Sequence, residues 1–337
     1  MLAGGNALGA FEAGAYARLH ARGLRPEWVV GVSMGAVNAA LIAGTPEDRR
    51  VEALRSFWQD ATLADPWDVP WVGPPEDMQR LRRQLRALTL GNPTIFAPRF
   101  AGGPGTPPDR IGLHDLAPLR RSLERLVDFD LLNRGPVRFS CRAVDLESGE
   151  DVIFDTRSMT VGPEHVVASC ALIPEFRPVE IDGRLFGDGG LSGNLPIETV
   201  TRDGTWGGLC VVVDPFSGHG RPFETLMEAA ARRFELMFAS QTRRQLETHD
   251  RERHLRTLLR QALDRLPPAQ RRSAAMAAAR AAAEHAEVDV ETVMWRASDE
   301  IGLRFYDYSP QAIDSRWQGG EAAAAELVDR LSADAVP

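Results

Sequence analysis

Apolar residues follow two different spacings along the first 45 residues. Small apolar side chains recur at helical spacing over 10–19, a short apolar run follows at 28–30, and helical spacing resumes over 36–42. Gly44 stands where the second helix should end, because glycine is the usual residue just past a helix C-terminus. The pattern therefore predicts a helix, a buried strand and a second helix, which is the order of an α/β fold.

Later segments predict more strands and then mainly helices. Apolar runs over 137–144 and 152–154 flank a Ser-Gly turn and predict a hairpin. A long amphipathic helix is predicted over 223–246, an Ala- and Arg-rich helix over 267–287, and a strand over 288–295. A chain of 337 residues accommodates one large α/β domain, or an α/β core with a helical appendage.

The first predicted strand runs directly into the pentapeptide Gly31-Val32-Ser33-Met34-Gly35. A Gly-x-Ser-x-Gly sequence between a strand and a helix is typical of a nucleophile elbow, a sharp turn that exposes the serine hydroxyl. Gly31 and Gly35 avoid collisions with neighbouring backbone in so tight a turn. A plain strand-to-helix turn is the alternative, since glycine and serine are common residues. Ser33 is therefore a candidate nucleophile.

A glycine-rich loop, Gly4-Gly5-Asn6 followed by Gly9, opens the first predicted helix. Such a loop presents unpaired backbone N–H groups and the positive end of a helix dipole. It predicts a place for a phosphate or a developing oxyanion, with a plain tight turn as the alternative. A dinucleotide loop is not matched, because the Gly-x-Gly-x-x-Gly pattern and the acidic residue after a second strand are both missing.

The segment Asp188-Gly189-Gly190 follows a second predicted hairpin. Apolar strands at 179–181 and 184–186 flank an Asp-Gly pair, which is typical of a tight two-residue turn. Asp188 then lies in a glycine-flanked turn, where other backbone can approach its carboxylate closely. Taken alone, this motif is also consistent with a purely structural turn.

Together and in this order, the consecutive glycines, the Gly-x-Ser-x-Gly pentapeptide and the Asp-Gly-Gly segment resemble the patatin-like phospholipase family. The resemblance covers about residues 1–215 and implies a three-layer α/β catalytic core with a mostly parallel central sheet. Residues 216–337 are expected to form a mainly helical C-terminal extension packed on the core. Within them, Tyr306-Asp307-Tyr308-Ser309 and Arg316-Trp317 resemble the extension of a bacterial subgroup of the family.

The resemblance implies a serine acyl hydrolase that cleaves carboxylic esters of lipids, or small esters, through an acyl-enzyme and without a cofactor. Carried over residue by residue, it implies Ser33 as the nucleophile and Asp188 as the base that takes its proton. It also implies an oxyanion loop. The residues of that loop are Gly4, Gly5 and Asn6, and the glycines that support the three motifs are Gly9, Gly31, Gly35, Gly189 and Gly190.

Three features depart from the family pattern. Asn6 stands where a third glycine is common, although asparagine keeps its N–H and tolerates left-handed backbone. Leu8 stands where many members carry a basic residue, which weakens the expectation of an anionic headgroup. Residues 1–3 precede the loop where a full apolar strand is expected, so either the first strand is very short or the chain start is truncated.

Two alternatives to the Ser33–Asp188 dyad remain open. His219 follows Ser33 and Asp188 in the chain order of a Ser-Asp-His triad and comes after an apolar strand candidate over 209–213. A lone histidine in a Ser-Gly loop is also consistent with simple solvation. The other alternative is a descendant of the fold that binds lipid or acts as a scaffold without catalysis.

The hydrophobic pattern breaks over about 60–112, where the chain is rich in proline, glycine and tryptophan. A helix is predicted within this insertion over 78–90. We expect the insertion to form a cap over the site, with a packed surface excursion as the alternative. The side chains that would line an acyl pocket are Trp67, Trp71, Ile95, Phe96 and Phe100.

Net charge and composition limit the classes of molecule that this protein is expected to bind. The net charge is −8, which argues against nucleic acid and gives no general attraction to anionic membranes, although arginine-rich helices leave transient contact with a membrane surface open. The chain has no lysine, so a Ser–Lys dyad and a Schiff base are excluded. The three cysteines are scattered and are expected to be buried thiols, not metal ligands. We expect no metal and a cytoplasmic location, and the sequence does not decide the oligomeric state.

Overall fold

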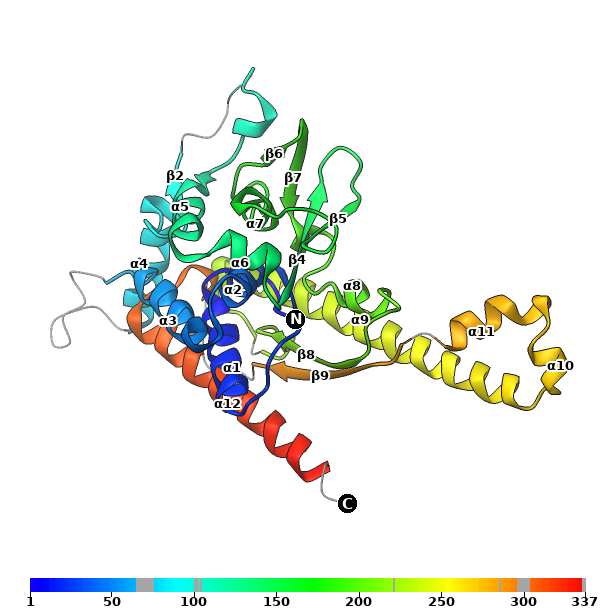
Figure 1. Ribbon diagram of the computed structural model, residues 1–337. Coiled ribbons are helices and arrows are strands. Elements are labelled where there is room, and N and C mark those ends of the chain that lie inside the picture. Colours follow the sequence, from blue (N-terminus) through cyan, green and yellow to red (C-terminus); the bar gives the residue numbers. More distant parts are fainter. Residues whose placement is uncertain are drawn as a thin grey trace.

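The computed structural model describes residues 1–64, 76–99, 103, 105–220, 222–284, 286–295 and 304–334. Figure 1 shows a central sheet among helices, with one helical arm projecting from the body. The strands are β1 (Trp28–Val32), β2 (Ala97–Pro98), β3 (His114–Asp115), β4 (Arg138–Asp145), β5 (Asp151–Asp155), β6 (Val179–Ile181), β7 (Arg184–Asp188), β8 (Gly208–Asp214) and β9 (Val288–Met294).

The helices surround this sheet and dominate the second half of the chain. The α-helices are α1 (Gly9–Ala21), α2 (Met34–Ala43), α3 (Arg50–Asp60), α4 (Glu76–Leu90), α5 (Ala117–Leu126), α6 (Phe129–Arg134), α7 (Pro163–Ser169), α8 (Ile197–Thr201), α9 (Leu226–Asp264), α10 (Pro268–Arg271), α11 (Ala277–Ala283) and α12 (Pro310–Asp334). The one-turn 3₁₀ helices are η1 (Asn6–Leu8), η2 (Glu47–Arg49), η3 (Pro108–Arg110), η4 (Gly189–Leu191), η5 (Ala274–Met276) and η6 (Arg304–Tyr306).

The central sheet is mixed, and the predicted α/β class is confirmed. Strand β4 pairs in parallel with β1 and antiparallel with β5 and β7, while β6 pairs antiparallel with β7. Leu2 joins these strands to the parallel pair β8–β9, because it forms single parallel bridges to Gly31 of β1 and to Val213 of β8. Residues 1–3 thus occupy a strand position with one bridging residue.

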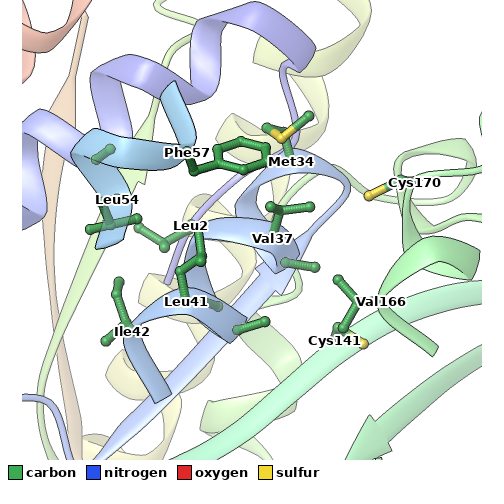
Figure 2. Packing of buried hydrophobic residues seen from close by; sticks show 14 of the residues in the cluster. Leu2, Met34, Val37, Leu41, Ile42, Leu54, Phe57, Cys141, Val166 and Cys170 are labelled. Atoms are coloured by element: carbon green, nitrogen blue, oxygen red, sulfur yellow. The ribbon is translucent and has the colours of Figure 1, made fainter. Parts of the chain in front are cut away.

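Alternation along the strands divides the interior into two apolar layers, because successive side chains point to opposite faces of a sheet. Val29 of β1 and Val213 of β8 belong to the larger cluster, with side chains of α1, α2, α3 and α12. Val30 and Val212 belong to a second cluster that includes residues of α8. Figure 2 shows part of the larger cluster, where side chains of α2 and α3 pack near Leu2. Helices therefore cover both faces of the sheet.

Helix α12 packs closely against α1 because each of the two helices places a glycine against the backbone of the other. A Cβ at Gly14 of α1 would lie 2.0 Å from the Trp317 carbonyl oxygen, and one at Gly320 would lie 1.9 Å from the Phe11 carbonyl oxygen. Any side chain at either position would push the helices apart. Helix α12 continues through both Gly319 and Gly320.

The predicted helices of the C-terminal region exist, with different limits. Thr225 and Glu228 form a capping box at the start of α9, and no proline follows before Pro267, so α9 runs for 39 residues. The predicted helix over 267–287 is broken into α10, η5 and α11. These pieces and the end of α9 form the projecting arm (Figure 1). No described helix is long and apolar enough to cross a membrane.

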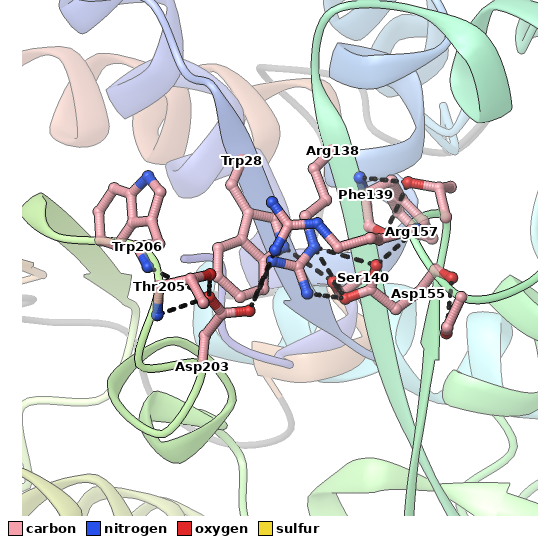
Figure 3. A network of polar contacts seen from close by, with 11 residues as sticks. Trp28, Arg138, Phe139, Ser140, Asp155, Arg157, Asp203, Thr205 and Trp206 are labelled. Atoms are coloured by element: carbon pink, nitrogen blue, oxygen red, sulfur yellow. Dashed lines mark hydrogen bonds and ion pairs between the residues drawn. The ribbon is translucent and has the colours of Figure 1, made fainter. Parts of the chain in front are cut away.

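Arg138 joins β1, β4, β5 and the segment before β8 through partly buried polar contacts (Figure 3). Its guanidinium donates to both carboxylate oxygens of Asp155, at 2.7 to 3.0 Å, and to Asp203 at 2.9 Å. It also lies 3.6 Å from the ring centroid of Trp28, whose indole N–H donates to Ser140. The network lies where β1 and β4 begin, since Trp28 pairs with Arg138.

We predict that Arg138→Ala lowers the free energy of unfolding by about 3 kcal/mol, because it leaves the buried Asp155 and the partly buried Asp203 carboxylates without this partner. Urea unfolding measures the change. The matched control is Arg134→Ala on α6, whose side chain is 81% exposed and whose loss should change stability by less than about 0.5 kcal/mol. Equal effects of the two substitutions would contradict a structural role for the network.

Candidate active site

Ser33 lies in the sharp turn between β1 and α2. Its backbone angles, φ 54° and ψ −126°, lie in a region that non-glycine residues seldom occupy. A Cβ at Gly31 would lie 2.4 Å from the Gly35 carbonyl, and one at Gly35 would lie 2.3 Å from the Leu2 carbonyl oxygen. The turn therefore requires both glycines. The Ser33 N–H donates to the Ser169 hydroxyl at 3.0 Å, which ties the turn to α7.

The register of the sheet brings Asp188 next to Ser33. Val32, the last residue of β1, pairs with Arg142 of β4, and Asp188, the last residue of β7, pairs with the adjacent Ala143. Since β5 pairs along the other edge of β4, β1 and β7 share one edge and meet end to end. Ser33 follows directly after β1. The hairpin predicted before Asp188 is confirmed as β6–β7.

The Asp188 carboxyl is 3% exposed and lies among apolar side chains. One of its oxygens accepts the Gly190 N–H at 2.7 Å. Burial raises the pKa of Asp188 to about 7, hydrogen bonds from the Gly190 N–H and the Ser33 side chain oppose that rise, and the charge of Glu175 adds to it. A carboxyl with this pKa is a much better proton acceptor at neutral pH than an ordinary aspartate.

The glycine-rich loop passes directly over Ser33. A Cβ at Gly4 would lie 2.9 Å from the Ser33 Cβ and 2.5 Å from Asn194 Oδ1. The Asn194 amide holds Gly4 from both sides, accepting its N–H and donating to its carbonyl, each at 3.1 Å. Asn6 adopts left-handed backbone with φ 51°. Within the described residues, the Gly5 and Asn6 N–H groups have no hydrogen-bond acceptor.

A mainly apolar cavity opens beside these groups. Ser33, Asp188 and the loop Gly4-Gly5-Asn6 all line it. Glu175 is the second acidic side chain in its wall, and burial is the main cause of its raised pKa. The apolar side chains in the wall come from both halves of the chain, and they include Ile95, Leu116, Leu119, Leu172, Phe176, Phe234, Phe238 and Phe305.

Part of the predicted insertion reaches this cavity. Ile95 lines it, whereas Phe96 packs edge-on against Phe176 beside it. The helix predicted over 78–90 is confirmed as α4. The other three side chains expected from the insertion lie outside the described residues, and they are Trp67, Trp71 and Phe100.

His219 lies away from the cavity wall. Its side chain is exposed, and its ring contacts the Ser217 carbonyl oxygen at 3.3 Å. The three cysteines are free and buried, as predicted. Across the described ranges, no three His, Cys, Asp or Glu side chains gather closely enough to hold a metal ion.

Several residues that shape the site are not singled out by the sequence motifs. Asn194 follows the Asp-Gly-Gly segment in a Gly-Asn-Leu-Pro turn, which is the local signal that could have marked it. Ser169 carries no such signal. Leu8 is fully buried in a small cluster with Phe216 and Phe238.

Comparison with known proteins shows the family to which the chain belongs. A family model described as patatin-like phospholipase matches residues 1–201, and one described as patatin phospholipase matches residues 236–336. Among solved structures the chain is similar to VipD from Legionella pneumophila, with a TM-score of 0.41 and 14% identity. That likeness covers 98% of this chain and 66% of that chain, so this chain spans less than two thirds of its length.

No curated protein matches the chain at a significant level. The first family model, however, covers more than half of the 337 residues. The chain therefore belongs to the patatin-like phospholipase family.

Proposed function

We propose that this protein hydrolyses carboxylic esters of lipids through a Ser33–Asp188 dyad. The observation that carries the proposal is the convergence of the Ser33 hydroxyl, a buried Asp188 carboxyl and the glycine-rich loop in one apolar cavity. A nucleophile, its base and anion-stabilising donors are the three parts that acyl transfer requires.

In the first half of the reaction, Asp188 takes the Ser33 hydroxyl proton while Oγ attacks the ester carbonyl carbon. The carbonyl oxygen becomes an oxyanion, which the Gly5 and Asn6 N–H groups stabilise together with the N-terminal end of the α2 dipole. Gly4 positions the loop, because its N–H is bonded to Asn194. The C–O bond to the alcohol then breaks, and Asp188 returns the proton to the leaving alcohol.

In the second half, water attacks the acyl group on Ser33 and Asp188 accepts a proton from that water. The new oxyanion occupies the same place beside Gly5 and Asn6. When the C–O bond to Ser33 breaks, the serine recovers its proton from Asp188 and the carboxylic acid leaves. Asp188 serves both halves because its pKa of about 7 allows it to accept and release a proton near neutrality.

The cavity wall favours an acyl chain over a charged group. Side chains such as Leu116, Leu119 and Phe238 form an apolar surface next to Ser33, which stabilises bound methylene groups by about 0.8 kcal/mol each when they are fully buried. We therefore infer that the acyl part of the ester lies in this cavity.

Ser33→Ala and Asp188→Asn are each predicted to reduce esterase activity to background, a loss of roughly 10⁴-fold or more. The first removes the nucleophile and the second removes the proton acceptor. Hydrolysis of p-nitrophenyl esters measures the loss, and a fluorophosphonate probe should label the wild-type chain but not Ser33→Ala. A wild-type chain without labelling or activity would indicate the non-catalytic descendant.

His219→Ala serves as the matched control for the mechanism. We predict activity within about twofold of wild type, since the His219 ring is exposed and outside the cavity wall. Loss of activity in His219→Ala with intact folding would instead favour a Ser-Asp-His triad.

The pH dependence tests the state of Asp188. Because the carboxylate is the active form, kcat/KM should rise with pH through about 7 and then level off. Glu175→Gln removes a negative charge that raises the pKa of Asp188, so the midpoint should move to lower pH.

Glu180→Gln is the matched control, because it removes one negative charge at an exposed position on β6. It should leave the midpoint of the pH profile unchanged. A wild-type midpoint near the ordinary aspartate value of about 4 would contradict a base perturbed by burial.

A further inference from the structure

The oxyanion loop continues into η1, and segments from the C-terminal half of the chain contact each residue of this single turn. The first contact is a side-chain hydrogen bond, in which the Tyr308 hydroxyl donates to Asn6 Oδ1. Tyr308 is almost fully buried, so its ring direction is fixed by packing and its hydroxyl holds the Asn6 side chain in one orientation.

The second contact is made by Arg316 of α12, whose side chain is fully buried. Its guanidinium donates to the Ala7 carbonyl at 3.1 Å, to the Asp307 carbonyl at 2.7 Å and to the Arg304 carbonyl at 2.9 Å. One planar cation therefore joins η1 to the segment that carries Tyr308. A guanidinium suits this role because its donors have a fixed geometry.

The third contact is apolar. The Leu8 side chain packs in a buried cluster with Phe216, Phe238 and Phe305, all of which come from residues after 215. On the other side of the loop, Gln241 of α9 accepts the Asn194 N–H at 3.1 Å, and Asn194 in turn holds Gly4. The C-terminal half thus contacts the loop on both flanks.

We propose that the C-terminal extension positions the oxyanion loop, with the Tyr308–Asn6 hydrogen bond as the contact that fixes its donors. This inference rests on the proposed function. A loop that begins with two glycines has high conformational freedom, while stabilisation of an oxyanion requires donors held in place before the reaction. The Asn6 N–H is such a donor, and Tyr308 anchors the side chain of the same residue.

The proposal also accounts for the two departures of this loop from the family pattern. A glycine at position 6 offers Tyr308 no side-chain acceptor, whereas Asn6 offers one and still adopts the required left-handed backbone. A basic residue at position 8 would bury a charge among phenylalanines, whereas Leu8 fits there. Asn6 and Leu8 therefore each suit the side chains of the extension that contact them, Asn6 by hydrogen bonding and Leu8 by apolar packing. Tyr308 is a positioning residue, because it does not line the cavity.

Two single substitutions and their double variant test the proposal. Tyr308→Phe removes the donor and Asn6→Gly removes the acceptor, with both backbones retained. We expect each to lower kcat for a p-nitrophenyl ester about tenfold and to leave KM within about twofold of wild type. This loss is smaller than the roughly 10²–10³-fold loss that follows removal of a hydrogen-bond donor from an oxyanion hole. The double variant should lose no more than either single variant, since all three lack the same bond.

Tyr16→Phe is the matched control, because Tyr16 is a buried tyrosine outside this cavity, and its kcat should stay at the wild-type value. Thermal unfolding identifies any variant that fails to fold, and Asn6→Gly then carries the test because Asn6 is partly exposed. The proposal is overturned if both single variants keep wild-type kcat, if KM changes and kcat does not, or if the losses multiply in the double variant.

The same assay separates this proposal from the proposed function. If wild type is active and Ser33→Ala is inactive while Tyr308→Phe and Asn6→Gly both equal wild type, the dyad stands and the positioning role fails. If Ser33→Ala retains the activity of wild type, the proposed dyad fails. The loop variants then report nothing about an oxyanion formed at Ser33.

Discussion

The site depends on two strand ends meeting at one edge of β4. Val32 and Asp188 pair with neighbouring residues of that strand, so the elbow after β1 and the turn after β7 are adjacent by register. A shift of either pairing by one residue would turn its side chains to the other face. The glycines that flank Ser33 and Asp188 permit this close approach, because a Cβ at Gly31, Gly35 or Gly189 would collide with backbone.

Burial then gives Asp188 the property that the proposed dyad requires. An aspartate in water is almost entirely ionised and weakly basic at neutral pH, whereas burial raises the pKa of Asp188 to about 7. The same exclusion of water strengthens hydrogen bonds to a developing oxyanion. Side chains from α9 and η6 complete the cavity wall, so the extension contributes to this environment as well as to the position of the loop.

The sequence predicted the parts of the site whose signal is local. The elbow around Ser33, the β6–β7 hairpin before Asp188 and the helices on either side of β1 each depend on neighbouring residues, and each was found. The contacts of Asn194 with Gly4 and of Tyr308 with Asn6 join residues 190 and 302 positions apart. No local pattern reports such pairs, because they arise from tertiary packing. For the same reason, the mixed pairing of β4 was not evident from the apolar runs.

The most direct test is a crystal structure of the protein inhibited by an alkyl phosphonate ester. The adduct imitates the tetrahedral intermediate, and its phosphoryl oxygen occupies the position of the oxyanion. We expect phosphorus bonded to Ser33 Oγ, the phosphoryl oxygen within hydrogen-bonding distance of the Gly5 and Asn6 N–H groups, and Asp188 beside Oγ. An adduct on another residue, or a phosphoryl oxygen directed away from the loop, would contradict it.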